Sequence, residues 1–152
     1  GFTPLAFAAH FGHVHTAEFL IGKGADLNSV SKHALHITPL LTALFGRKIL
    51  MAKVLVEHGA DVNARRAGAG WPRAGWTALH YCAGYGFVEL VAPLLERGAD
   101  VDALDDENRT PLKVAIESGQ HEIADLLRRG GASDWPDASE PNNPHQGNRD
   151  PE

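Results

Sequence analysis

Histidine is the residue type in this chain with the broadest capacity for chemistry, since its imidazole binds metal ions and exchanges protons near neutral pH. The sequence contains nine histidines, of which His10, His13 and His15 form the densest group. A zinc site needs ligands at characteristic spacings, and neither a cysteine partner nor an HExxH pattern accompanies this group. We therefore predict that the chain holds no metal ion and no cofactor.

The glycines Gly68, Gly70 and Gly75 are a second candidate, because glycine-rich loops can surround phosphate groups. This run lacks the Lys-Ser/Thr pair of a nucleotide-binding loop, and no strand–loop–helix pattern surrounds it. Serine, histidine and aspartate are plentiful, but none of them stands in a catalytic motif. The chain is therefore not expected to be an enzyme.

The segment 64–76 has a composition that favours binding. It reads ARRAGAGWPRAGW and supplies Arg65, Arg66, Trp71, Arg73 and Trp76. Tryptophan and arginine are enriched in the hot spots of protein interfaces, so this segment is expected to bind a partner that is acidic, extended or rich in aromatic side chains. RNA binding is disfavoured, because the rest of the chain lacks basic character.

A later segment is acidic and carries Asp102, Asp105, Asp106 and Glu107. Two alternatives follow for these carboxylates and the arginines of 64–76. The two segments present their charges to a partner, or they pair with each other across the surface, which stabilises a protein only slightly. The sequence leaves both alternatives open.

A repeat along the chain shows which elements position these residues. Four times a threonine precedes a Gly-Ala pair by 21 residues, and successive threonines are 35, 39 and 33 residues apart. The threonines are Thr3, Thr38, Thr77 and Thr110, and they open the segments TPLAFAA, TPLLTAL, TALHYCA and TPLKVAI. Constant internal length with variable connections is typical of a stacked repeat array.

These motifs resemble those of the ankyrin repeat family, and the resemblance covers residues 1–132. Gly-Ala-Asp occurs at 24–26, 59–61 and 98–100, and a glycine between paired helices occurs at Gly12, Gly86 and Gly119. The resemblance implies a mainly α-helical solenoid, in which each repeat combines a β-hairpin, here called a finger, with an α-hairpin. We expect repeats at about 1–28, 29–63, 64–102 and 103–132, the first of them truncated at its N-terminal end.

The residues also favour helices in their own right. Threonine before proline suits a helix start, glycine after two leucines suits a helix end, and apolar residues recur between them at helical spacing. We predict first helices over 4–11, 39–46, 78–85 and 111–118, and second helices over 14–22, 49–58, 88–97 and 121–129. Arg47 replaces the glycine between two helices and Pro93 falls inside a helix, so local strain is predicted at both.

The resemblance further implies that finger tips and first helices line a concave surface. Its expected members are Phe7, His10, Phe11, Thr42, Phe45, Tyr81, Tyr85, Val114, Glu117 and Ser118 on the helices, and Phe2, Ile37, Trp76 and Arg109 before the threonines. We expect Phe45, Tyr85 and Trp76 to be exposed on this concave ridge. For Phe7, Tyr81 and Val114, packing between repeats is the favoured alternative.

Composition limits the remaining possibilities. The formal net charge is −5, and most of it lies after Ser133, where five acidic residues stand against one arginine. A nearly neutral array gives no support for binding to nucleic acid or membranes. Residues 133–152 are rich in Pro, Asn and Asp, so we expect a disordered tail. The single cysteine, Cys82, is expected to be buried, and an intracellular, cytoplasmic location is favoured because no disulfide can form within the chain.

Together these features predict a non-catalytic, monomeric module, part of a longer chain, that binds a protein through its concave ridge and its long 64–76 finger. The residues expected to contact the partner are Phe45, Arg65, Arg66, Trp71, Arg73, Trp76, Tyr81, Tyr85, Asp105, Asp106 and Arg109. The alternative is the substrate-recognition or regulatory arm of a larger enzyme or channel, of which this chain is a C-terminal fragment.

Overall fold

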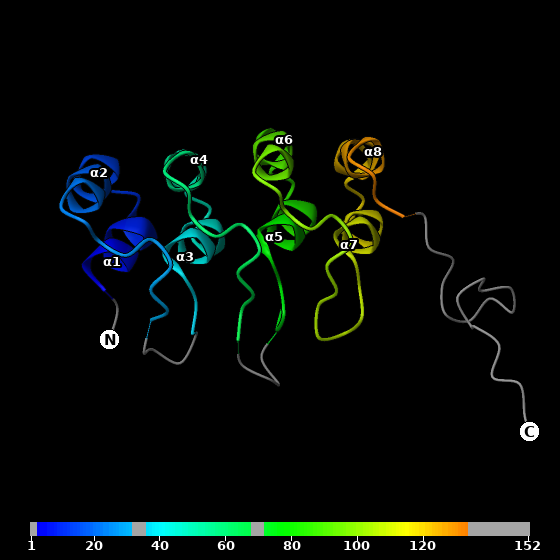
Figure 1. Cartoon of the computed structure of the whole chain (residues 1–152). Coiled ribbons are helices and arrows are strands. Elements are labelled where there is room, and N and C mark those ends of the chain that lie inside the picture. Colours follow the sequence, from blue (N-terminus) through cyan, green and yellow to red (C-terminus); the bar gives the residue numbers. More distant parts are fainter. Residues whose placement is uncertain (1–2, 32–35, 68–71, 134–152) are drawn as a thin grey trace, which may run out of the picture.

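The computed structural model describes residues 3–31, 36–67 and 72–133, and within these ranges eight α-helices form four antiparallel pairs (Figure 1). They are α1 (Pro4–Phe11), α2 (Val14–Gly22), α3 (Pro39–Phe45), α4 (Ile49–Glu57), α5 (Ala78–Tyr85), α6 (Val88–Glu96), α7 (Pro111–Glu117) and α8 (His121–Arg129). Each helix lies within one residue of its predicted bounds. The predicted fold class, a mainly α-helical repeat solenoid, is confirmed.

The helices stand in two rows (Figure 1). The inner row is made of α1, α3, α5 and α7, and the fingers project beyond it; the outer row is made of α2, α4, α6 and α8. Within each row a helix contacts its equivalents in the adjacent pairs, as α3 does with α1 and α5. Each pair therefore covers an apolar face of its neighbour, as expected for a repeat stack.

Threonine fixes the start of every inner helix. The hydroxyls of Thr3, Thr38 and Thr110 accept hydrogen bonds from the backbone N–H three residues later, at 3.2, 3.4 and 3.1 Å, and a proline follows each threonine. Thr77 lacks the proline, and there the imidazole of His80 completes a capping box by accepting from the Thr77 N–H at 3.2 Å. Each cap satisfies backbone donors that the helix leaves free.

A left-handed residue follows each inner helix and lets the chain reverse. Gly12, Gly86 and Gly119 have φ values of 78°, 81° and 69°, and Arg47 takes the same conformation at 55°. The strain predicted at Arg47 is therefore present, and it costs about 1 kcal/mol relative to glycine. Pro93 lies inside α6, which continues past it, and the bend expected there stays a prediction.

The core lies between the two rows and between neighbouring pairs. Its largest fully buried side chains include Leu5, Leu40, Leu41, Leu44, Met51, Leu55, Leu79, Tyr81, Leu90, Leu94 and Ile123. Cys82 is buried as predicted, and burial raises the pKa of its thiol, so the sulfur stays protonated and inert. All helices in the described ranges fall short of the length and apolarity that a membrane crossing requires.

One polar contact recurs between consecutive repeats on their outer loops. The Oδ1 atom of Asn28 accepts from the backbone N–H of Asp61 at 2.8 Å, and that of Asn63 accepts from Asp100 at 2.7 Å. These asparagines occupy equivalent positions, two residues after the aspartate of each Gly-Ala-Asp. An asparagine thus joins the first repeat to the second and the second to the third, and Asp102 makes the equivalent contact to the Ser133 N–H at 3.0 Å.

Candidate protein-binding surface

Trp76 lies in the middle of the inner face, at the base of the long finger. Its indole covers Gly84 on α5 so closely that a Cβ atom at Gly84 would lie 2.5 Å from the ring. The ring also packs edge-on against Tyr81 at a centroid distance of 5.2 Å, and Trp76 is only 6 % exposed. The expected exposure of Trp76 is therefore wrong, because the missing side chain at Gly84 leaves room for the indole.

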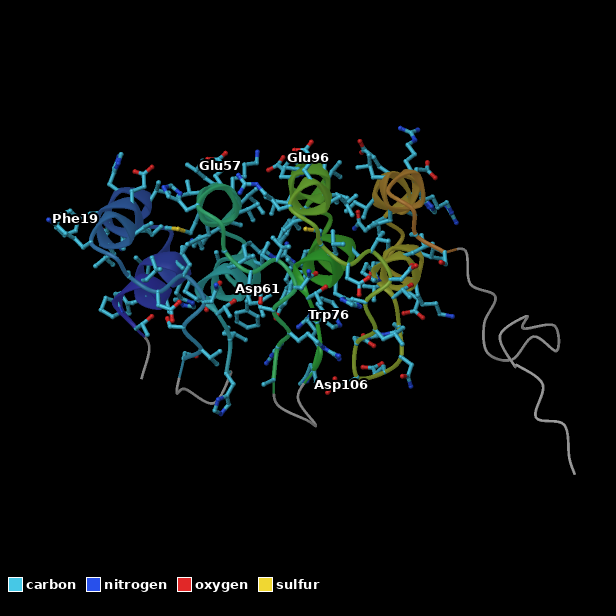
Figure 2. The ribbon with its side chains drawn as sticks, viewed as in Figure 1. Phe19, Glu57, Asp61, Trp76, Glu96 and Asp106 are labelled. Atoms are coloured by element: carbon cyan, nitrogen blue, oxygen red, sulfur yellow. The ribbon has the colours of Figure 1, made fainter. Side chains whose placement is uncertain are left out.

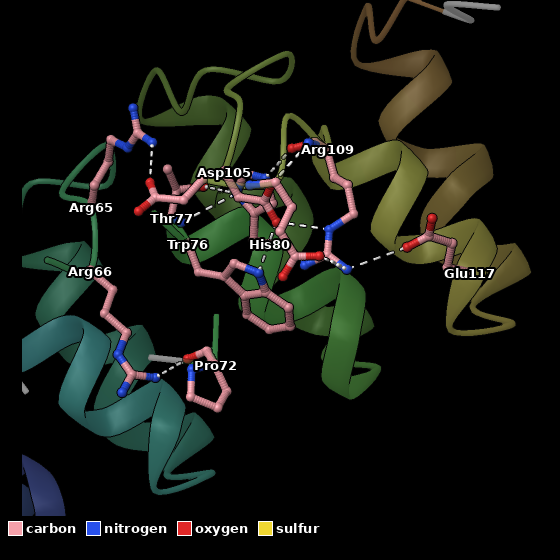
Figure 3. Close-up of polar contacts among 11 residues, drawn as sticks. Arg65, Arg66, Pro72, Trp76, Thr77, His80, Asp105, Arg109 and Glu117 are labelled. Atoms are coloured by element: carbon pink, nitrogen blue, oxygen red, sulfur yellow. Dashed lines mark hydrogen bonds and ion pairs between the residues drawn. The ribbon is translucent and has the colours of Figure 1, made fainter. Parts of the chain in front are cut away.

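Asp105, in the next finger, holds Trp76 in this position (Figure 3). Its buried carboxylate accepts five hydrogen bonds. The donors are Trp76 Nε1 at 3.2 Å, the backbone N–H groups of Glu107 and Arg109 at 2.9 Å each, and the Arg109 guanidinium at 3.0 and 2.9 Å. Burial by itself would raise the pKa of Asp105, but these donors and the charge of Arg109 hold that pKa below its usual value.

His80 connects α5 to the same finger. Its Nδ1 accepts from the Thr77 N–H, so the proton resides on Nε2, which donates to the Arg109 carbonyl oxygen at 2.9 Å. Burial lowers the pKa of His80, although the Arg109 carbonyl opposes this effect. The imidazole is therefore neutral and serves as a structural link between the third and fourth repeats.

The two charged fingers pair with each other, which was one of the two alternatives. Arg65 and Asp106 form an ion pair at 3.2 Å, with both side chains about half exposed, and the Asp106 N–H donates to the Ala74 carbonyl oxygen at 3.2 Å. A Cβ at Gly75 would lie 2.6 Å from the Asp106 nitrogen, so the fingers touch closely.

Arg109 likewise forms its ion pairs within the fourth repeat (Figure 3). Its guanidinium contacts the carboxylate of Asp105, and it lies 3.3 Å from that of Glu107 and 3.6 Å from that of Glu117. The sequence predicts that these four residues contact a partner protein, but their geometry favours pairing within the chain. They are Arg65, Asp105, Asp106 and Arg109.

Two aromatic side chains remain partly open on the inner face between α3 and α5, and three arginines lie against them. Phe45 and Tyr85 are half-buried there. The guanidinium carbons of Arg47 and Arg73 lie 4.6 and 5.1 Å from the centroid of the Tyr85 ring, and that of Arg66 lies 5.8 Å from the Phe45 ring, which suits cation–π contacts. We call these five residues the aromatic–arginine face.

Sequence reasoning missed one member of this face. Arg47 was noted there only as a strained replacement for glycine, yet its side chain is exposed and covers Tyr85. The available signal was its place directly beyond the helix that carries Phe45, at the end of the expected ridge.

Other members of the expected ridge are distributed differently. Tyr81, Val114 and Ile37 are buried, so packing between repeats is the role that the structure gives them. Because Tyr81 is inaccessible, the contact role expected for it is not favoured. Phe7 is 53 % exposed, contrary to the packing alternative, and Trp71 lies outside the described residues.

The α1–α2 end of the array carries a second exposed apolar group. Phe7, Phe11 and Phe19 are each at least half exposed, and Figure 2 shows Phe19 pointing away from the array. Beside them lies a shallow hollow of about 480 Å³, lined by Thr3, Pro4, Phe7, Ala8, His13, Thr16 and Leu20. Unlike the aromatic–arginine face, this hollow has no arginine or lysine among the described residues that line it.

No grouping of three or more His, Cys, Asp or Glu side chains suited to a metal ion occurs in the part of the chain that the structure describes. His10, His13 and His15 do not converge on a common point.

Comparison with known proteins agrees with the architecture. The family model described as ankyrin repeats (three copies) matches residues 1–66 and again 67–135. The chain is 33 % identical over 141 residues to the B-cell lymphoma 3 protein homolog of Mus musculus, covering 93 % of this chain and 29 % of that protein. It is 39 % identical over 102 residues to the putative E3 ubiquitin-protein ligase XBAT34 of Arabidopsis thaliana, covering 66 % and 26 %.

A third relative is Rabankyrin-5 of Homo sapiens, 46 % identical over 79 residues, which cover 48 % of this chain and 7 % of that protein. The chain spans less than a third of the length of each of these relatives. The paired helices, the threonine caps, the left-handed turns and the family match over both halves agree. The chain belongs to the ankyrin repeat family.

Proposed function

We propose that this chain is a non-catalytic protein-interaction module that acts inside the cell and binds its partner on the inner face of the array. The observation that carries this proposal is the aromatic–arginine face, where Phe45 and Tyr85 remain partly open beside Arg47 and Arg73. Aromatic and arginine side chains contribute most to the affinity of protein interfaces. The long finger contributes Arg66 and Arg73 to this face, and the buried Trp76 packs beneath Arg73 at 5.3 Å from its guanidinium carbon.

A second candidate is favoured by the relatives. One of them is named a putative E3 ubiquitin-protein ligase and another a transient receptor potential cation channel subfamily member, and the chain covers 26 % and 10 % of them. In this candidate the same surface recognises the substrate or regulator of a larger enzyme or channel. The sequence of the complete transcript separates the two, because a catalytic or pore-forming domain in the same polypeptide would support the second candidate.

Selection from a random peptide library against the full chain tests the binding surface itself. We expect peptides that lose at least about tenfold in affinity for Tyr85→Ala, since truncating a hot-spot residue costs about 2 kcal/mol or more. The matched control is Leu50→Ala on the outer helix α4, where the side chain is 66 % exposed, and it should leave affinity unchanged. Melting curves of both variants verify that the fold is retained.

Two results would contradict the proposal. One is a set of binders that Leu50→Ala abolishes and Tyr85→Ala does not affect. The other is the absence of any binder from a library that yields ligands for an unrelated repeat protein in parallel.

A further inference from the structure

The three arginines of the aromatic–arginine face form no ion pair with an acidic side chain among the described residues. Arg65, Arg109 and Arg128 each form an ion pair with a carboxylate. The cluster formed by Arg47, Arg66 and Arg73 forms none, and its members come from the α3–α4 turn and from both sides of the long finger. Three positive charges thus gather on one patch without neutralisation by the described part of this chain.

Arg66 is the arginine of this patch whose buried hydrogen-bond donors are least satisfied. It is only 5 % exposed, one of its N–H groups donates to the Pro72 carbonyl oxygen at 2.8 Å, and its Nε–H has no acceptor within the described chain (Figure 3). The hydroxyl of Tyr81 is also buried without a well-formed hydrogen bond among the described residues, but it lies close enough to the Arg66 guanidinium for that group to lower the pKa that burial raises. A buried cation without a counter-charge is costly, and a carboxylate brought by a ligand would remove part of that cost.

The equivalent residue of the next finger shows how such a position is otherwise satisfied. The backbone N–H of Arg66 donates to Trp76 as that of Asp105 donates to Arg109, so the two residues occupy matching places. Asp105 is paired with the guanidinium of Arg109 in its own finger. Arg66 has no such counter-ion among the residues that the structure describes.

From this arrangement we infer that the arginine cluster is the binding site for an acidic segment of a partner protein, which lies extended across Tyr85 and Phe45 with its Asp or Glu carboxylates on the accessible Arg47 and Arg73, where they also offset the buried charge of Arg66. The inference rests on the proposed function and specifies the partner's chemistry. The planar guanidinium group matches a carboxylate with two parallel hydrogen bonds, and arginine stacked on an aromatic ring is already oriented for this contact.

The neighbouring repeat limits the length of the acidic stretch. The fourth repeat presents Asp105, Asp106, Glu107 and Glu117 against Arg65 and Arg109, so carboxylates outnumber guanidinium groups there. A long polyanion such as RNA that extends across this repeat would be repelled. A short acidic stretch that ends before the fourth repeat avoids that repulsion.

The peptide selection described above tests this inference separately from the proposed function. We expect selected peptides to be enriched in Asp and Glu and to lose about tenfold in affinity for each of Arg47→Gln and Arg73→Gln, because each substitution removes a charge-assisted hydrogen bond. Arg129→Gln, on the exposed side of α8, is the matched control and should have no effect. Replacing every Glu of a selected peptide by Gln should abolish binding, and raising the salt concentration should weaken it.

The negative results are distinct. If selected peptides depend on Tyr85 but are not acidic and are indifferent to Arg47→Gln and Arg73→Gln, the inference is overturned and the proposed function stands. If a single-stranded RNA oligonucleotide binds the cluster and acidic peptides do not, the ligand class is wrong.

The acidic residues after Ser133 of this same chain are the remaining alternative occupant of the arginine cluster. They are tested by selecting against a variant in which Asp134, Asp137 and Glu140 are changed to their amides. If only this variant binds acidic peptides, the tail is the occupant and the assignment to a partner fails.

Discussion

Replacing Asp105 by asparagine is the sharpest test of how the fingers are held. The wild-type carboxylate accepts five hydrogen bonds from Trp76, Glu107 and Arg109 and is fully buried. Asparagine keeps the shape and one oxygen, which can still accept from the two backbone N–H groups. Its amide NH₂, however, faces the donors of Arg109 and Trp76, so both lose their acceptor.

The expected loss follows from these contacts. Removing one partner of a buried ion pair costs about 3–5 kcal/mol, and leaving a buried donor unpaired adds to it. Arg109 retains Glu107 and Glu117 at 3.3 and 3.6 Å, which places the loss near the lower bound. We therefore expect Asp105→Asn to lower the free energy of unfolding by about 3 kcal/mol and the melting temperature by roughly 10 °C.

Urea unfolding followed by circular dichroism at pH 7 measures this loss, with Asp106→Asn as the matched control. Asp106 pairs with Arg65 at the surface, where both side chains are about half exposed, so its loss should cost no more than about 1 kcal/mol. Because the pKa of Asp105 is lowered in the folded state, its contribution is present above its unfolded value of 3.8 and is lost as the pH falls through the folded pKa. Equal unfolding energies for the two variants would refute the role given to Asp105.

Two further predictions concern the same region. Gly84→Ala should destabilise the protein by about 1–3 kcal/mol, because the new methyl group collides with the Trp76 indole. Gly22→Ala is the control: the space around Gly22 in α2 is open, so this change should be neutral or stabilising by up to about 1 kcal/mol. Thermal melts of both variants measure the difference. Since burial lowers the pKa of His80, unfolding free energy should fall as the pH drops below its unfolded value of 6.5, by up to about 1.4 kcal/mol per pH unit. His80→Gln should be less stable at pH 7 but lose this pH dependence, and His58→Gln should keep it; an unchanged slope in His80→Gln would contradict the assignment.

Helix positions were predictable because local residues decide them. A threonine hydroxyl caps its own helix, as at Thr38, and glycine takes the left-handed conformation that the chain needs next, as at Gly86. Both signals lie within a few residues of the boundary that they determine. The helix pairs followed from them without reference to tertiary contacts.

The position of Trp76 was not predictable in this way. Its burial depends on the Asp105 carboxylate in another finger and on the space that Gly84 leaves by lacking a side chain, and neither residue is adjacent to the tryptophan in the sequence. The sequence nevertheless indicates where this space lies. The places equivalent to Gly84 in the other repeats hold His10, Phe45 and Glu117, so a glycine there marks a missing side chain that another group can fill.

The aromatic–arginine face was predictable only in part for a related reason. Composition identified Arg66, Arg73, Phe45 and Tyr85 as candidates, but not which charges are neutralised within the chain. That depends on the register between fingers, which decides that Arg65 meets Asp106 while Arg66 meets no carboxylate among the described residues.

The link between the third and fourth repeats also constrains how this array can grow or shrink by duplication of whole units. The place taken by Asp105 is taken by Ser31 and Arg66 in the two preceding fingers, as their matching backbone hydrogen bonds show. If the third unit were copied in tandem, the first copy's Trp76 would face an arginine donor instead of a carboxylate acceptor. Asn28, by contrast, joins its neighbour through a backbone N–H that any inserted unit could offer. Insertion of a whole unit near the beginning of the array is therefore expected to be tolerated, whereas a unit inserted between the last two would break the contact between Trp76 and Asp105.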